Sequence, residues 1–183
     1  IEGQRSALER DHAIRAIYIN KDLSSGSECR ALVAEAAAQL APPDILVNNA
    51  GIQHVADIEN FPEAKWRTII DLMLTARFLL TQAAWPYMRQ GGWGRIVNIA
   101  SIGGQWGGIN QVHYATAKAG LIGFTRSLAR VFSGVGVTSN AVAPGLVHTE
   151  MSAEELETDA GRRKVSEIPI GRIATSEEVA SAV

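Results

Sequence analysis

The stretch Asp44-Ile45-Leu46-Val47-Asn48-Asn49-Ala50-Gly51 decides the fold predicted for this chain of 183 residues. Its apolar run is short and continuous, as in a strand buried on both faces, and it ends in small and polar residues typical of a turn. Two similar runs follow, over residues 94–101 and 137–145. Helical patterns separate the three runs, which favours parallel strands joined by helices. We therefore predict an α/β fold with a doubly wound parallel sheet.

The remaining elements are predicted from periodicity and from helix start and stop signals. They are a strand over 14–19, helices over 28–40, 62–90 and 114–132, and a capping box of Thr175 and Glu178 before a final helix.

Composition indicates one domain over residues 1–183, since 46% of the residues are hydrophobic and 20% are charged. The single cysteine, Cys29, cannot form an internal disulfide, which favours a reducing compartment.

The first residues are too charged for a signal peptide, and no apolar run reaches the ~18 residues of a membrane span, so we expect a cytoplasmic protein with no membrane partner. A net charge of −2 gives no basic surface for nucleic acid, and four scattered histidines predict no metal site.

Three residues have the chemistry to move a proton at a carbonyl group. Tyr114 and Lys118 are four apart, so on a helix they lie on one face, and Ser101 follows a predicted strand. Reduction of a ketone leaves an oxyanion that must take a proton. A lysine ammonium makes a neighbouring phenol a better proton donor and acceptor, and a serine hydroxyl can hold the substrate oxygen. We predict that all three are catalytic; taken alone, the Tyr-x-x-x-Lys pattern also fits an ordinary helix face.

Four motifs together resemble those of the short-chain dehydrogenase/reductase family. They are Asn48-Asn49-Ala50-Gly51, Ser101, Tyr114-x-x-x-Lys118 and Pro144-Gly145, with the tyrosine 13 positions after the serine. The resemblance implies a Rossmann-like fold, NAD or NADP as cofactor, and a homo-tetramer or homo-dimer. The segments over 111–129 and 168–180 are similar to 3-oxoacyl reductases, and residues 50–55 to 3-hydroxybutyrate dehydrogenases. The implied reaction is hydride transfer between a 3-oxoacyl and a 3-hydroxyacyl group.

The same resemblance implies roles for further residues. The implied cofactor-binding residues are Asp22 beside the adenine, Asn49, Ala50 and Gly51 at one ribose, Tyr114 and Lys118 at the nicotinamide ribose, and Pro144, Gly145, Val147 and Thr149 at the carboxamide. Gln53 and Trp106 are the candidate substrate residues. Asp22 also fits a turn at a helix start, and Trp106 also fits surface packing.

No glycine-rich turn precedes Ile14, and neither Gly26 nor Gly51 replaces one. By the family resemblance, we expect a chain truncated at both ends, without the first strands, the phosphate loop and the last strand. The choice between NAD and NADP therefore stays open.

Met73 departs from the family pattern, which has an asparagine at this place on the long helix. A thioether has no N–H to donate, so our hypothesis is that proton exchange with solvent is slowed or rerouted. Met73 also fits a simpler role, in which its side chain only fills a core position on the helix. The rival function is a non-catalytic or impaired family member, or a fragment, that keeps the fold and an oligomer interface.

Overall fold

The computed structural model describes residues 2–183, except for the side chains of Glu154 and Glu155. Three strands, β1 (Ile45–Asn48), β2 (Gly94–Ile99) and β3 (Val137–Val142), form one parallel sheet in the order β1-β2-β3. Their register places Leu46 opposite Ile96 and Ile96 opposite Ser139. The predicted parallel sheet is confirmed, because each of the three apolar runs contributes one strand.

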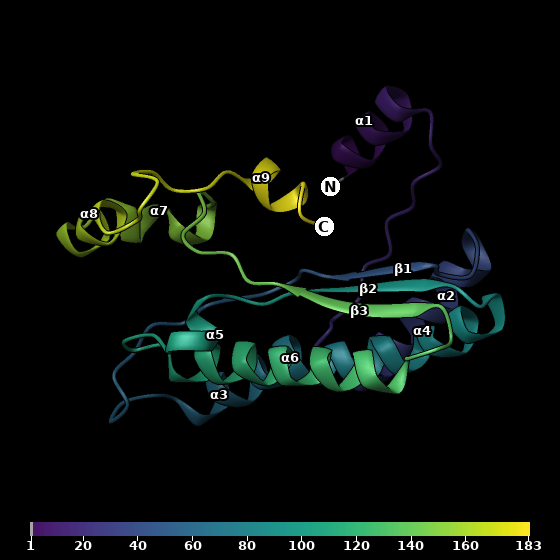
Figure 1. The fold of residues 1–183 in the computed structure, drawn as a ribbon, viewed down its shortest axis with the longest axis horizontal. Helices are drawn as coiled ribbons and strands as arrows, with labels where there is room; N and C mark the ends of the chain where they lie inside the picture. The colour runs from purple at the N-terminus through teal and green to yellow at the C-terminus, as the bar shows by residue number, and fades with distance from the viewer. Residues whose placement is uncertain (1) are drawn as a thin grey trace.

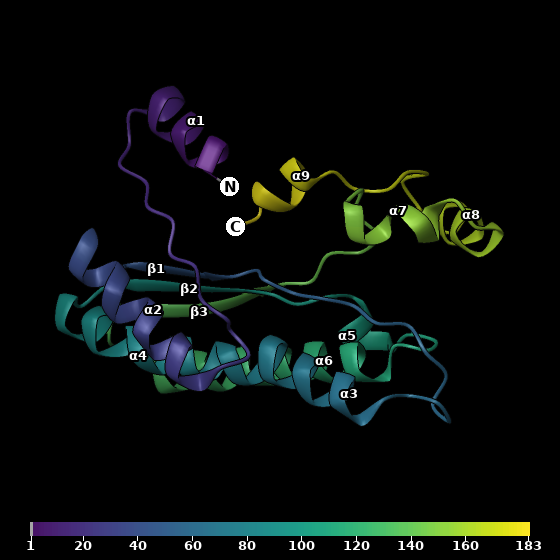
Figure 2. The same cartoon turned by 180° about the vertical axis from the view of Figure 1, so that it is seen from behind.

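Helices cover one face of this sheet. The helices α2 (Gly26–Gln39), α4 (Ala76–Gly91) and α6 (Val112–Val131) lie side by side against it, and α3 (Glu63–Ile70) lies next to α6 (Figures 1 and 2). Between these layers the main core brings Met88 of α4 against Ile96 of β2 and Val137 of β3. The Trp85 and Phe132 rings stack with centroids 4.2 Å apart. The helix predicted over 28–40 is α2, and that over 114–132 is α6.

The other face of the sheet is open. The helices α1 (Glu2–His12), α7 (Glu150–Leu156), α8 (Asp159–Ser166) and α9 (Ser176–Ala180) lie on this side, separated from the strands in both views (Figures 1 and 2). Ile45 and Val47 alternate with inward residues along β1 and are 57% and 43% exposed. A strand side chain normally packs on a neighbouring layer, so these two apolar side chains of β1 are left largely uncovered in the described part of the chain, on a face that they share with Arg95, Thr138 and Asn140.

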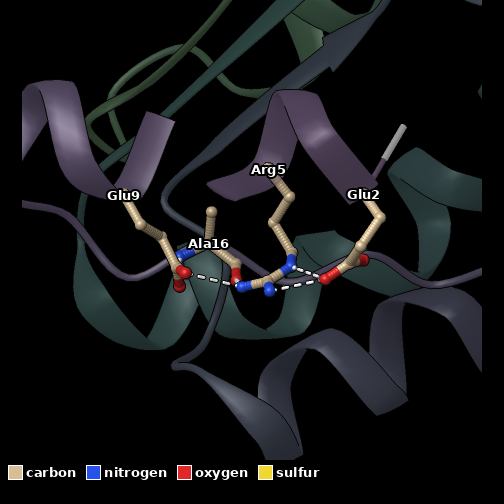
Figure 3. A network of polar contacts seen from close by, with 4 residues as sticks. All are labelled: Glu2, Arg5, Glu9 and Ala16. Carbon is tan, nitrogen blue, oxygen red and sulfur yellow. Dashed lines mark hydrogen bonds and ion pairs between the residues drawn. The ribbon is translucent and has the colours of Figure 1, made fainter. Parts of the chain in front are cut away.

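The prediction of a strand over residues 14–19 is wrong. The chain there is neither helix nor strand. Ala16 uses its backbone groups otherwise: its N–H donates to Glu9 over 3.0 Å, and its carbonyl accepts from Arg5 over 3.4 Å (Figure 3). Alternating apolar residues favour an extended chain, but a strand also needs a neighbour, and no strand in the described residues lies beside this segment.

The long helix predicted over 62–90 is found as α3 and α4, joined by the π-helical segment η1 (Asp71–Thr75). Pro62 precedes the first helical residue, and Gly92, at φ 66°, ends the run in the left-handed conformation that glycine adopts easily. Sequence periodicity did not predict the wide turn of η1. No helix in the part of the chain that the structure describes is long and apolar enough to cross a membrane.

The capping box predicted near the C-terminus is confirmed. The Thr175 hydroxyl accepts from the Glu178 N–H over 3.3 Å, and the Glu178 carboxylate accepts from the Thr175 N–H over 2.9 Å. Together they begin α9. A bridge between Val147 and Ala174 places this C-terminal segment beside the chain that follows β3.

Candidate active site

The candidate site lies where the carboxyl ends of the three strands meet. In a parallel sheet these ends share one edge, which is where such folds bind ligands. Asn49 follows β1, Ser101 follows β2, and Pro144 follows β3. Two backbone hydrogen bonds tie the last two segments: Ala100 N–H to Val142 O over 2.7 Å, and Ile102 N–H to Pro144 O over 3.0 Å.

The structure brings Ser101, Tyr114 and Lys118 together. A Cβ placed on Gly103, in the short helix α5 (Gly103–Trp106), would lie 3.4 Å from Ser101 Oγ and 3.8 Å from Tyr114 Cε1. The two side chains therefore face the same small volume. Lys118 Nζ lies 5.5 Å from the centroid of the Tyr114 ring, one helical turn along α6. The juxtaposition expected from the spacing is present.

Lys118 is only 4% exposed. Its ammonium donates to Ile99 O, at the end of β2, over 2.5 Å. Burial, and then the positive charge of Arg77, lower the pKa of Lys118 to about 8. An ammonium in a poorly solvated place is destabilised, so this lysine can lose its proton in a pH range where an exposed lysine keeps it.

Arg77 is a buried residue that sequence reasoning missed. It lies on α4, is 1% exposed, and donates through its guanidinium to the carbonyls of Leu72 and Ala50. Burial lowers the pKa of Arg77 to about 10. An arginine on an amphipathic helix is usually a surface residue, and the only sequence signal was its place directly before the apolar run that contains Leu79 and Leu80.

A buried amide network was also missed. Asn48 donates to Asn98 over 2.8 Å, Asn98 donates to the Thr125 hydroxyl over 2.9 Å, and that hydroxyl donates to Leu121 O over 2.7 Å. The network links β1, β2 and α6 directly beneath the site edge. The two asparagines are opposite each other in the sheet, and their equivalent places near the ends of two strand motifs were the available signal. Asn48 thus fixes the strands, whereas Asn49 is exposed.

Two histidines gather beside Tyr114. His113 is fully buried, with its ring centroid 4.5 Å from Phe61 and 6.5 Å from His54. Neither ring nitrogen of His113 has a hydrogen-bond partner in the described part of the chain. Burial, and then His54, lower the pKa of His113, which favours the neutral ring. Gln53 precedes His54 and is half-buried, and its substrate role stays a prediction.

Other predicted residues lie less clearly in the site. Asp22 Oδ1 accepts from the Ser24 N–H over 2.9 Å and from its hydroxyl over 2.7 Å, an arrangement typical of a turn before a helix. Trp106 is 80% exposed at the end of α5. The Thr149 hydroxyl lies 3.3 Å from that of Ser152. Their cofactor and substrate roles stay predictions.

Met73 lies in η1 and is buried with Ile69 and Ala117, in a cluster against which Tyr114 packs. Its Cε would lie 3.5 Å from a Cβ added at Gly51, an ordinary contact. Methionine therefore fills the space between the long helix, α6 and the turn after β1. In the described residues, no group of three or more His, Cys, Asp or Glu side chains could hold a metal ion.

Comparison with known proteins gives the family. Residues 3–160 match the model of the short chain dehydrogenase family. An acetoacetyl-CoA reductase of Rhizobium meliloti (strain 1021) is 43% identical over 162 residues, which are 88% of this chain and 67% of that protein. A 3-oxoacyl-(acyl-carrier-protein) reductase of Aquifex aeolicus (strain VF5) is 44% identical over 140 residues, 76% of this chain and 56% of that protein. The chain belongs to the short-chain dehydrogenase family.

A solved structure shares the fold over the whole chain. It is described as a candidate NAD(P) dependent gluconate 5-dehydrogenase from Beutenbergia cavernae with NADP bound at low occupancy. The match has a TM-score of 0.89 and 34% sequence identity, and it covers 100% of this chain and 74% of that one. The parallel sheet and its helices are therefore those of the family.

Proposed function

We propose that the protein is an NAD(P)-dependent oxidoreductase that interconverts a 3-oxoacyl and a 3-hydroxyacyl group. The observation that carries this proposal is the convergence of Ser101, Tyr114 and Lys118 at the carboxyl edge of the sheet. Two relatives at more than 40% identity are named as reductases of acetoacetyl-CoA and of 3-oxoacyl groups on a carrier protein, which supports the substrate class.

The described residues fit the reacting half of a nicotinamide dinucleotide. The turn at Asn49 and Ala50 is exposed at the site edge, so its backbone is open to a ribose. Lys118 offers an ammonium to ribose hydroxyls, and the Pro144-Gly145 turn lies against the segment after Ser101. When bound, the dinucleotide supplies or accepts the hydride. In the described residues before β1 there is no strand, and so no glycine-rich turn between a strand and a helix of the kind that suits a pyrophosphate.

The side chains divide the proton chemistry among them. During reduction the carbonyl carbon gains a hydride while the π electrons of the C=O bond move to oxygen. Tyr114 gives its phenolic proton to that oxygen, and the Ser101 hydroxyl holds the oxygen in place. The Lys118 ammonium stabilises the phenolate that remains, until solvent returns a proton. Oxidation of the alcohol reverses each step.

Turnover with acetoacetyl-CoA tests the proposal. The purified protein should oxidise NADH or NADPH when acetoacetyl-CoA is added, and Ser101→Ala should reduce kcat by roughly 100-fold. Ser133→Ala, which removes an exposed hydroxyl beyond α6, is the matched control and should leave the rate unchanged. A protein that binds neither nucleotide and oxidises neither would contradict the proposal.

A second candidate function is a non-catalytic family member that keeps the fold and a homo-dimer or homo-tetramer interface. The burial of Met73, where the family has an asparagine, favours it. It predicts nucleotide binding without turnover, together with a multi-subunit mass in sedimentation. A buried free thiol at Cys29 supports a reducing, cytoplasmic location under either function.

A further inference from the structure

Arg77 is the largest fully buried side chain among the described residues. No ion pair in the described part of the chain includes it. Burying a cation without a carboxylate is unfavourable unless other polar groups replace its water. The groups that do so here are two backbone carbonyls, which indicates that this arginine has a specific task.

The two carbonyls belong to different parts of the site. Leu72 lies in η1, the wide turn of the long helix, and Ala50 lies in the turn that follows β1. One planar guanidinium thus joins the helix to the turn. Arginine can donate to two acceptors in fixed directions at once, whereas a lysine ammonium is a single point of charge on a flexible stem.

The position of Arg77 also matters for charge. The titratable groups that interact electrostatically with Arg77 are Cys29 on α2 and Lys118 on α6. Lys118 in turn lies beside Tyr114. The like charge of Arg77 adds to burial in disfavouring the Lys118 ammonium. Cys29 is buried, and burial raises the pKa of its thiol, so it offers no compensating anion near neutral pH.

We infer that Arg77 is a positioning residue: its guanidinium fixes the Asn49–Gly51 turn against η1, and its positive charge acts on Lys118. The inference rests on the proposed function, because that turn is the one assigned to the cofactor ribose. Two separate effects follow. The bridge between the carbonyls holds the turn in shape, and the charge sets how readily Lys118 gives up its proton.

Two substitutions separate the bridge from the charge. Arg77→Met removes both, whereas Arg77→Lys keeps the charge and loses the two-acceptor bridge. Arg89→Met, an exposed position on the same helix α4, is the matched control. The pKa of Lys118 is read from NMR of lysine labelled with ¹³C at Cε, with its resonance identified by loss in Lys118→Met. Nucleotide affinity is read by titration with NADPH and with NADH.

We expect Arg77→Met to raise the pKa of Lys118 above about 8 and to weaken nucleotide binding by roughly 10-fold or more, the scale of one lost charge-assisted hydrogen bond. Arg77→Lys should keep the pKa of Lys118 near that of the unsubstituted protein yet still weaken binding. Arg89→Met should change neither.

A folded Arg77→Met protein that binds both nucleotides as tightly as the unsubstituted protein would overturn the inference, and an unchanged pKa of Lys118 would remove its electrostatic part. If Arg77→Met does not fold, Arg77→Lys decides: full nucleotide affinity in that variant removes the role of the bridge. If the unsubstituted protein binds neither nucleotide, the proposed function fails, while the Lys118 titration still tests the electrostatic effect of Arg77.

Discussion

Two regions of this molecule differ in how closely their elements pack together. Around Ser101 and Lys118, two strands and a helix pack together, and buried hydrogen bonds connect them. Around residues 13–20 the chain is extended, and α1 holds it only through exposed and half-buried polar groups. The contrast teaches that an apolar run forms a strand only where a neighbouring strand pairs with it.

The outer edge of β1 is a second place where the described residues pack loosely. A cavity of about 270 Å³ lies between α2, β1 and α4, and its lining is largely apolar, with Leu32, Val33 and Leu46 among the residues around it. On one side β1 has no neighbouring strand in the described residues, so its outer backbone groups are unpaired with any strand.

The largest effect that tests this comparison should come from Tyr114→Phe. The phenol is the group assigned to proton transfer, so its loss should reduce kcat by about 100-fold to 10,000-fold with little change in KM. Steady-state kinetics with acetoacetyl-CoA measure it. Tyr87→Phe on α4 is the control and should behave as the unsubstituted protein. Equal activity of both variants would mean that the well-packed region is not the reaction centre.

The next effect concerns the buried charge of Lys118. Its pKa is about 8 in the folded chain and is ordinarily 10.5, so the unfolded chain holds more protons between these pH values. The free energy of unfolding should therefore rise with pH across this window, by up to roughly 3 kcal/mol relative to Lys118→Met. Urea denaturation at both ends of the window measures the difference. Lys65→Met, at an exposed position, should show no such trend, and a flat Lys118 difference would contradict the assigned burial.

Asn98→Ala tests how much the buried hydrogen bonds beneath the site contribute to the free energy of unfolding. It leaves the buried amide of Asn48 and the hydroxyl of Thr125 without their partner, which should decrease the free energy of unfolding by about 2–4 kcal/mol. Chemical denaturation measures this loss. Asn140→Ala, at an exposed position on β3, serves as control and should have little effect. Similar stabilities of the two variants would show that the network does not hold the site edge together.

The smallest effect on nucleotide affinity is expected at Asp22, which follows the extended segment over residues 13–20. If this residue serves only the turn with Ser24, Asp22→Ala should lower the melting temperature slightly and change nucleotide affinity by less than about threefold. Asp57→Ala, which removes a similar turn carboxylate before Asn60, is the control. A much larger loss of affinity in Asp22→Ala alone would favour the adenine role implied by the family.

Much of the fold and site could be predicted from local sequence. Short apolar runs specified β1, β2 and β3, and the four-residue spacing placed Tyr114 and Lys118 on one helix face. The fate of residues 14–19 could not be predicted, because strand formation depends on a neighbour that periodicity does not report. The Arg77 bridge and the Asn48–Asn98 pair depend on which faces meet after folding.

The π-helical segment η1 has a consequence for the direction in which the long helix faces. Each α-helical residue advances by about 100°, and a π-helical turn holds one residue more than an α-helical turn. The residues after η1 therefore face about 100° away from where an uninterrupted α-helix of the same sequence would place them. Before η1, α3 packs on α6, and after it, α4 packs on α2. A single helix can therefore present two differently oriented stripes to two neighbours. An uninterrupted α-helix of the same sequence, with every residue kept, would turn one of those stripes away from its neighbour.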